Sequence, residues 1–565
     1  MAFHLNHKRI KKDIDPDEIF LDSKNLPNFN VQQFEGRMEK AIPKFSIYII
    51  GLFFTIVLII FSWKTASLQI AKGEFYLEKS QNNTLMKQPI FADRGLVYDR
   101  NGVMLAWNSW PTGDVNKLES PSRSYFPEPG FGLLLGYVSA PAKDKTGKYW
   151  QDNFIGKDGV ENFYNERLTG VNGERITEMD VQGNVHSENI ILPPQKGEDL
   201  YLSIDSRIQN KMYESIASMA ENVRFQGGAG VIMDIHNGEL LAITSYPEYD
   251  STVLSNGKNK DKINNYFKDK RKVFLNRSVS GLYSPGSIVK PFFAYAALVE
   301  EIINPAKKIL ANGFISIPNP YYPEQKSIFK DHDVFGYVDM RKAIAVSSDI
   351  YFYEIGGGFE DQKGLGILNL DKYSKIFGIG EKTGIDLIGE KTGLIPTPEW
   401  KVKTFKGDPW RIGDTYNTSI GQYGFQVTPV QMAKATAGLA SMGKFYTPHI
   451  LKDDESFKEN LTETKFDEEK MKVVFEGMRM AVTEGTCVAL NLPNIKVAAK
   501  SGTAQVGLGN TNTNSWVIGF FPYENPKYAF ALVMERGPKS ASGNATRVMR
   551  EVVDFMALYT PEYFD

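Results

Sequence analysis

The chain has 565 residues, of which 42% are hydrophobic and 23% charged, a balance typical of several globular domains rather than one core. Its net charge of −2 gives no general attraction to polyanions, so the composition does not indicate a nucleic-acid partner. A single cysteine, Cys487, excludes an intrachain disulfide and a cysteine-based zinc site. The six histidines show no metal-ligand spacing, so we expect no metal or other cofactor, and a serine hydrolase would need a base other than histidine.

Phe45 to Trp63 is an uncharged run of mostly Ile, Leu, Phe and Val between Lys44 and Lys64, and it is long enough to span a bilayer. A signal peptide begins within the first residues of a chain, whereas a mostly polar tail precedes this run. We therefore expect an uncleaved, single-pass anchor. Basic residues at 8, 9, 11 and 12 mildly favour a cytoplasmic N-terminus, which would place the remainder of the chain outside the cytoplasmic membrane.

The segment after the anchor is predicted to consist mostly of short strands and loops, because Gly and Pro are frequent and no long helical period persists. Asn101-Gly102 lies between short apolar runs and predicts a hairpin. Residues 156–173 have apolar positions at near-helical spacing and end in Gly, which predicts a short helix. A longer amphipathic helix is expected from Asp205 to about Glu221.

The C-terminal part of the chain is predicted to be a sheet covered by helices. A hairpin with an Asn237-Gly238 turn is expected first, then mainly helices over residues 288–440, then strands over 497–499, 516–521 and 528–534 and a last helix over 545–558. This order predicts an α+β fold. The four expected segments are a tail (1–44), an anchor (45–63), a strand-rich domain (64–215) and an α+β domain (216–565).

Ser287 stands three residues before Lys290, in Tyr283-Ser-Pro-Gly-Ser-Ile-Val-Lys-Pro291. A serine hydroxyl is a weak nucleophile unless a base lies within hydrogen-bond reach, and a helix that begins at Ser287 would place the lysine over the hydroxyl. The apolar run after Pro291 is typical of a buried helix. Alone, the pair is also compatible with a buried helix that carries a surface lysine at one end.

Two further motifs follow in the chain. Ser347-Ser348-Asp349 lies between apolar runs, and Lys500-Ser501-Gly502-Thr503 follows the expected strand at 497–499. By themselves the first could be a helix cap or a turn and the second a strand end. Their order after the Ser-Lys pair instead indicates one site for acyl transfer.

The chain resembles the penicillin-binding proteins and serine β-lactamases, whose active sites carry S-x-x-K, S-x-N and K-[TS]-G in this order. It is similar to the class B penicillin-binding proteins in particular. Asp349 in place of Asn favours the elongation-specific transpeptidases of that class, and the division-specific ones are the alternative. One departure is Asn514-Ser515-Trp516, where relatives often have His-Ala-Trp. The other segments that carry the resemblance are 94–102, 156–161, 168–170, 276–277, 383–387, 392–401, 421–422 and 428–431.

The resemblance implies an extended pedestal, or dimerisation-like, domain over 64–215 and a transpeptidase domain over 216–565. It implies that Ser287 is the nucleophile and that Lys290 is its base, which must be neutral and whose pKa Lys500 would lower. Ser347 would pass a proton to the leaving amine. Asp349 would orient Ser347 and Lys290 by hydrogen bonding. Whether Asp349 pairs with Lys290 or with another cation stays open. The expected substrate-binding residues are Ser501, Gly502 and Thr503, which with Lys500 would hold a carboxylate, and the backbone N–H groups of Ser287 and Thr503 would form the oxyanion hole.

The implied function is a peptidoglycan D,D-transpeptidase that cross-links stem peptides through an acyl-serine and is inhibited by β-lactams. Expected partners are D-Ala-D-Ala stem-peptide ends, β-lactams, a SEDS-family glycan polymerase and other elongation-complex proteins, at a membrane and without nucleic acid. Alternatives are a β-lactam sensor, which usually has more membrane spans, and a scaffold with an inactive site. The segment before the transpeptidase domain is too short for an added glycosyltransferase.

Overall fold

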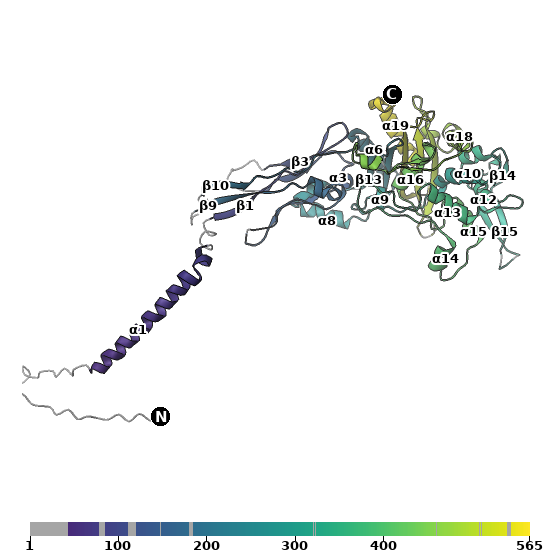
Figure 1. Ribbon diagram of the computed structural model, residues 1–565. Coiled ribbons are helices and arrows are strands. Elements are labelled where there is room, and N and C mark those ends of the chain that lie inside the picture. Colours follow the sequence, from purple (N-terminus) through teal and green to yellow (C-terminus); the bar gives the residue numbers. More distant parts are fainter. Residues whose placement is uncertain are drawn as a thin grey trace, which may run out of the picture. The chain divides into compact units, whose positions relative to one another are not determined.

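The computed structural model (Figure 1) divides into two compact units, Met1–Met86 with Glu178–His186, and Lys87–Thr177 with Ser187–Asp565. The residues that the structure describes are 43–77, 85–110, 120–146, 148–179, 185–319, 321–322, 324–458, 460–507, 509, 511–539 and 544–564.

The first unit contains helix α1, Lys44–Ala66, which continues as a π-helical turn over Ser67–Ala71. None of the α1 residues is buried, as expected for a helix whose apolar side chains face lipid. Among the described residues this is the one helix long and apolar enough to cross a membrane, judged by length and composition. The predicted tail, residues 1–44, lies almost wholly outside the described residues.

The N-terminal part of the second unit is rich in short strands, as predicted. Strands β2 (Val97–Tyr98) and β3 (Met104–Ser109) form the antiparallel hairpin expected from Asn101-Gly102, with Gly102 at φ +83°. The helix expected over 156–173 is two short helices, α4 (Gly159–Phe163) and α5 (Asn165–Leu168). The sheets are β1-β9-β10, β11-β2-β3-β4, β5-β8 and β6-β7. The other bounds are β1 Leu85–Ile90, β4 Ser122–Tyr125, α3 Gly132–Leu135, β5 Val138–Ser139, β6 Ala142–Lys143, β7 Tyr149–Gln151, β8 Ile155–Gly156, β9 Gly173–Met179, β10 Val185–Leu192 and β11 Leu200–Tyr201.

A buried ion-pair network joins these short elements. Glu161 of α4 accepts from Arg94 Nε at 2.6 Å and from Arg123 Nε of β4 at 2.7 Å, and all three side chains are at most 2% exposed. Burial alone would raise the pKa of Glu161, but the two guanidinium groups hold it below its usual range. The segments 94–102 and 156–161, which carry part of the family resemblance, are therefore joined in space by Arg94 and Glu161.

The C-terminal domain is built on a five-stranded antiparallel sheet with the order β13-β12-β22-β21-β20. Its strands are β12 Gly227–Asp234, β13 Leu240–Tyr246, β20 Ala498–Val506, β21 Asn512–Phe521 and β22 Tyr528–Pro538. The sheet unites a hairpin near residue 240 with the last strands of the chain. Lys500-Ser501-Gly502-Thr503 lies inside β20, so the expectation that the strand ends before Lys500 was wrong.

Both faces of this sheet are covered by helices (Figure 1). Ile232 of β12 packs in one apolar cluster with α6 (Ser206–Val223) and α19 (Ala545–Tyr559). Val231 and Met233 belong to the other cluster, with α10 (Lys290–Val299) and α16 (Pro429–Ala440). Successive residues of a strand point to opposite faces of its sheet. Because both faces are covered, Val231, Ile232 and Met233 of β12 are all apolar and buried. The predicted α+β fold is confirmed.

The segment between α10 and α16 is not only helical, because four short strands interrupt it: β14 Ile309–Ala311, β15 Phe314–Pro318, β16 Lys326–Lys330 and β17 Gly336–Val338. They pair as β14-β17 and β15-β16. Strands β18 (Lys444–Phe445) and β19 (Thr462–Glu463) form a further pair. The remaining helices are α7 Ser251–Asn256, α8 Lys260–Lys268, α9 Arg277–Ser280, α11 Met340–Val346, α12 Asp349–Gly357, α13 Gly366–Ile376, α14 Pro398–Thr404, α15 Ile412–Ser419, α17 Glu455–Lys458 and α18 Glu468–Glu484.

Candidate active site

Ser287 lies in a 3₁₀ turn, Gly286–Val289, that leads directly into α10, whose first residue is Lys290. Side chains three residues apart eclipse one another in a 3₁₀ turn, so the two residues share a face as the sequence predicts. Pro291 falls within the first turn of α10, where the missing N–H costs no hydrogen bond. Lys290 is fully buried, whereas Ser287 is partly exposed.

Backbone contacts fix the Ser287 turn from two sides. Gly286 N donates to Gly421 O at 2.9 Å, and a Cβ on Gly421 would lie 2.3 Å from Gly286 O. On the other side a Cβ on Gly502 would lie 2.9 Å from Pro285 O. Since real Cβ atoms do not approach a carbonyl that closely, glycine at 421 and 502 permits the close approach that holds the turn.

The second motif forms the junction between α11 and α12. Ser347 has φ +65° and ends α11, and Ser348 is the N-cap of α12. Lys290 Nζ donates to Ser347 O at 2.7 Å, to Asp349 Oδ1 at 2.6 Å and, at 3.3 Å, to Ser347 Oγ. The open question of the Asp349 partner thus has a structural answer, because Asp349 pairs with Lys290.

The third motif adds a second buried lysine to the same hydroxyl. Lys500 Nζ donates to Ser347 Oγ at 2.8 Å and to Ser501 O at 2.7 Å. Burial, followed by the positive charge of Lys290, lowers the pKa of Lys500 to about 7. Lys500 is therefore partly neutral near pH 7 and can accept a proton from the hydroxyl that it shares with Lys290.

A pocket of about 770 Å³ opens above these residues. The structure brings six of the eight sequence-predicted site residues to its wall, and the two lysines lie buried beneath it. One hydroxyl of the wall, Ser501 Oγ, donates to Thr486 Oγ1 at 2.7 Å. The six are Ser287, Ser347, Asp349, Ser501, Gly502 and Thr503.

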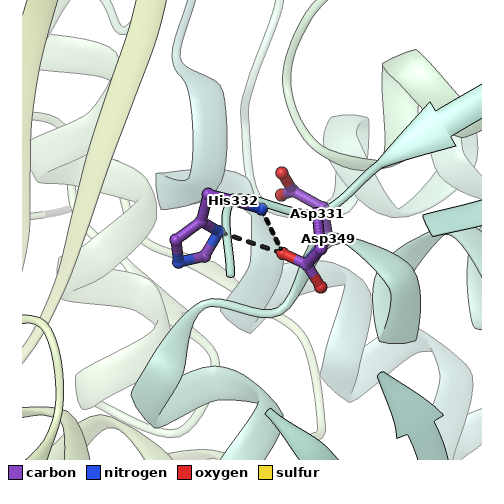
Figure 2. A group of neighbouring side chains, drawn as sticks. All are labelled: Asp331, His332 and Asp349. Carbon is purple, nitrogen blue, oxygen red and sulfur yellow. Dashed lines mark hydrogen bonds and ion pairs between the residues drawn. The ribbon is translucent and has the colours of Figure 1, made fainter. Parts of the chain in front are cut away.

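A further carboxylate beside the pocket has no counterpart in the sequence-based prediction. Asp331 lies between Lys330 and His332, which both line the pocket, and Figure 2 shows the His332 ring turned toward the Asp331 carboxylate. The ligand atoms of Asp331, His332 and Asp349 all lie within 4.8 Å of one another, so these residues could hold a metal ion. Asp331 lies 17 residues before Ser348 of the second motif, and no spacing pattern marks it.

Comparison with known proteins extends the resemblance over most of the chain. Residues 228–554 match the penicillin binding protein transpeptidase domain and residues 111–202 the penicillin-binding protein dimerisation domain. Peptidoglycan D,D-transpeptidase MrdA of Acinetobacter baumannii is 28% identical, over 94% of this chain and 90% of that protein.

Two solved structures share the fold. The penicillin-binding protein PBP2 of Helicobacter pylori in complex with MreC has a TM-score of 0.68 and 27% identity, over 84% of this chain and 98% of that one. A chain from a peptidoglycan synthase complex that coordinates polymerization and crosslinking has a TM-score of 0.68 and 25% identity, over 90% of this chain and 97% of that one. Since the transpeptidase domain alone covers more than half of the chain, the protein belongs to the class B penicillin-binding proteins, as its motifs indicate.

Proposed function

We propose that the protein is a peptidoglycan D,D-transpeptidase that cross-links stem peptides through an acyl-serine intermediate during cell-wall elongation. The observation that carries the proposal is the convergence of two buried lysines on one hydroxyl. Lys290 and Lys500 both donate to Ser347 Oγ, beneath a pocket whose wall includes Ser287. Such an arrangement supplies a nucleophile, a base and a proton carrier within one site.

In the acylation step Ser287 Oγ attacks the carbonyl carbon between the two terminal D-alanines. The new C–O bond forms, the amide C–N bond breaks, and the proton of the serine leaves by way of Lys290 and Ser347 to the departing D-alanine amine. In the second step an amine of a neighbouring stem attacks the ester. The amide C–N bond forms, the C–O bond breaks, and Ser287 recovers its proton.

The base must be neutral to accept a proton, and Asp349 at 2.6 Å favours the charged form of Lys290. Lys500 offers a way round this conflict, because its pKa of about 7 leaves much of it neutral at physiological pH. Ser347 Oγ contacts both amines, so a proton can pass from Lys290 through the hydroxyl to Lys500. Lys290 then becomes the base that receives the Ser287 proton.

Substrate binding is assigned to the part of β20 that lines the pocket. Ser501 and Thr503 lie two residues apart, so their side chains lie on one face of the strand. Their hydroxyls can bind the terminal carboxylate of the donor peptide, with Lys500 as the buried positive charge behind them. The backbone N–H groups of Ser287 and Thr503 would receive the oxyanion. β-Lactams resemble the D-Ala-D-Ala end and would acylate Ser287 in the same way.

The proposed setting is the outer face of the cytoplasmic membrane, with α1 as the single anchor. A SEDS-family polymerase and other proteins of the elongation complex are the proposed partners. This assignment is supported by the relatives, one of which forms a complex with MreC and another of which belongs to a peptidoglycan synthase complex. The transpeptidase would then act on glycan strands that a partner makes.

The test is a cross-linking assay with lipid II and a partner polymerase. The wild-type protein should yield cross-linked muropeptides, and Ser287→Ala should yield glycan strands without cross-links. Equal cross-linking by both proteins would contradict the proposal.

Depletion in cells separates the two candidate roles, because rounded cells are expected from lost elongation, whereas filaments would favour the division-specific alternative.

A further inference from the structure

Asp331 has a fully buried side chain directly beside the second motif. Its Oδ2 accepts from Ser348 Oγ at 2.7 Å and from Ile350 N at 3.1 Å, and its Oδ1 accepts from Asp349 N at 3.0 Å. Asp331 directly follows β16, so these hydrogen bonds join the end of β16 to the start of α12. The carboxylate is therefore engaged by three donors of the Ser348–Ile350 segment.

The three donors belong to the N-terminus of α12, which begins at Asp349. The first N–H groups of a helix have no acceptor within the helix, and a negative charge there is favourable. Burial alone would raise the pKa of Asp331, but hydrogen bonds from His332, Ser348 and the two backbone groups together hold it well below its usual range. Asp331 thus stays ionised and caps α12 from another part of the chain.

The capped segment is the one that receives Lys290. Ser347 has φ +65°, a conformation that is strained in a residue other than glycine and persists only where its surroundings impose it. Ser347 O, Ser347 Oγ and Asp349 Oδ1 are the acceptors of Lys290. Their positions depend on the junction between α11 and α12, and Asp331 holds the α12 side of that junction.

We propose that Asp331 is a positioning residue that caps α12 and thereby holds Ser347 and Asp349 in the geometry that receives Lys290. The inference rests on the proposed acylation of Ser287. A metal ion bound by Asp331, His332 and Asp349 could also fix the segment. Hydrogen bonds already engage both Asp331 oxygens and Asp349 Oδ1, so the protein can hold this geometry by itself.

The experiment measures covalent labelling of the full-length protein, in detergent, by a fluorescent penicillin. Asp331→Asn keeps the shape of the side chain but replaces one acceptor oxygen by a donor. The second-order rate constant of acylation should fall about 10- to 100-fold, the scale of a misplaced catalytic group, while the final label per protein reaches the wild-type amplitude. Ser348→Ala should give a smaller fall, because Asp331 retains its two backbone donors.

Asp333→Asn is the matched control, since Asp333 is exposed and accepts from the neighbouring Val334 N; it should label at the wild-type rate. The inference would be overturned if Asp331→Asn were acylated at the wild-type rate. It would also be overturned if the rate constant fell only by the same factor as the final label per protein. Slower labelling of wild-type protein after treatment with a chelator would also overturn it, in favour of a bound metal. Failure of wild-type protein to label at all would instead contradict the proposed function.

Discussion

Two lysines that share one hydroxyl dominate the electrostatics of the site. Lys290 lies 2.6 Å from a carboxylate. Lys500 instead donates to Ser347 Oγ and to the Ser501 carbonyl, and burial and the charge of Lys290 are the main causes that lower its pKa. A buried ammonium without a carboxylate partner loses its proton easily. Lys500 is therefore the group that can accept the proton of Lys290 at neutral pH.

This difference predicts the pH dependence of acylation. The pKa of Lys500 is lowered to about 7, so its neutral form, which can take up a proton, grows as the pH rises through 7. The second-order rate constant for penicillin acylation reports groups of the free enzyme and should rise with a midpoint near pH 7. A rate that is constant between pH 6 and pH 8 would contradict the assigned role of Lys500.

Lys500→Arg provides the companion experiment for that profile. Arginine keeps the positive charge but does not titrate in proteins. The variant should lose the midpoint near pH 7 and acylate at least about 10-fold more slowly at pH 8, which corresponds to about 1.4 kcal/mol. Penicillin labelling at several pH values measures both effects. If the pH profile of Lys500→Arg kept its midpoint near pH 7, a group other than Lys500 would be the one that titrates.

The residues of the three motifs could be predicted from the sequence because their spacing is local and their order is fixed. Asp331 could not, since its contacts with Ser348 and Asp349 arise only when β16 packs beside α12. The positive φ of Ser347 was also beyond prediction, because serine rarely adopts it and the surrounding structure imposes it. The burial that lowers the pKa of Lys500 is likewise a property of the fold.

At the scale of elements, the position of the nucleophile depends on close backbone contacts between loops and strands. Gly421→Ala should slow acylation at least about 10-fold, because the new Cβ would lie 2.3 Å from Gly286 O and displace the Ser287 turn. Gly378→Ala is the control, since Gly378 has a similar φ, +72° against +74°, with no atom within 4 Å of the added Cβ. Equal labelling rates in the two variants would show that the contact does not position Ser287.

The buried network of Arg94, Arg123 and Glu161 makes a prediction about stability. Glu161→Gln removes the carboxylate shared by Arg94 and Arg123, and breaking a buried pair in this way costs about 3–5 kcal/mol. The exposed pair of Arg167 with Glu198 is the comparison, and Glu198→Gln should cost about 0–1 kcal/mol. Thermal or denaturant unfolding measures the difference, and similar losses in both variants would contradict the structural role of Glu161.

Elements with strong local signals were predictable, such as the hairpins at Gly102 and Gly238 and the helix capped by Asp205. The extension of β20 through Lys500 to Val506 was not. Gly, Ser and Lys have little intrinsic preference for strands, and the pairing of Lys500 with Ile518 and of Thr503 with Ser515 imposes the extended conformation. The short strands of 309–338 were missed for another reason: they contain strand-forming Ile, Phe, Tyr and Val, but each is only three to five residues long.

At the scale of the whole molecule, the site is assembled by a sheet that joins distant parts of the chain. The order β13-β12-β22-β21-β20 places the motif of β20 at an edge, where it meets the turn that carries Ser287. A sequence can indicate that such a sheet exists, but the pairing of strands far apart in the chain follows from packing of both apolar faces.

The anchor is predicted to be dispensable for acylation. The residues of the site lie in the compact unit that contains the sheet, and α1 lies in the other. A fragment of residues 64–565 should therefore label with penicillin within about 2-fold of the full-length rate, since distant and independent parts contribute additively. Kinetic labelling of the two proteins is the measurement, and a large loss in the fragment would make the anchor part of the acylation machinery.

The most direct test of the central claim is the identification of the acylated residue. After incubation with penicillin, intact-mass and peptide mass spectrometry of the wild-type protein should find one acyl group, on Ser287. Ser287→Ala should take up none, whereas Ser284→Ala, a change in the same segment, should be labelled as the wild type is. Stoichiometric label in Ser287→Ala, or an acyl group on another residue of the wild type, would contradict the account.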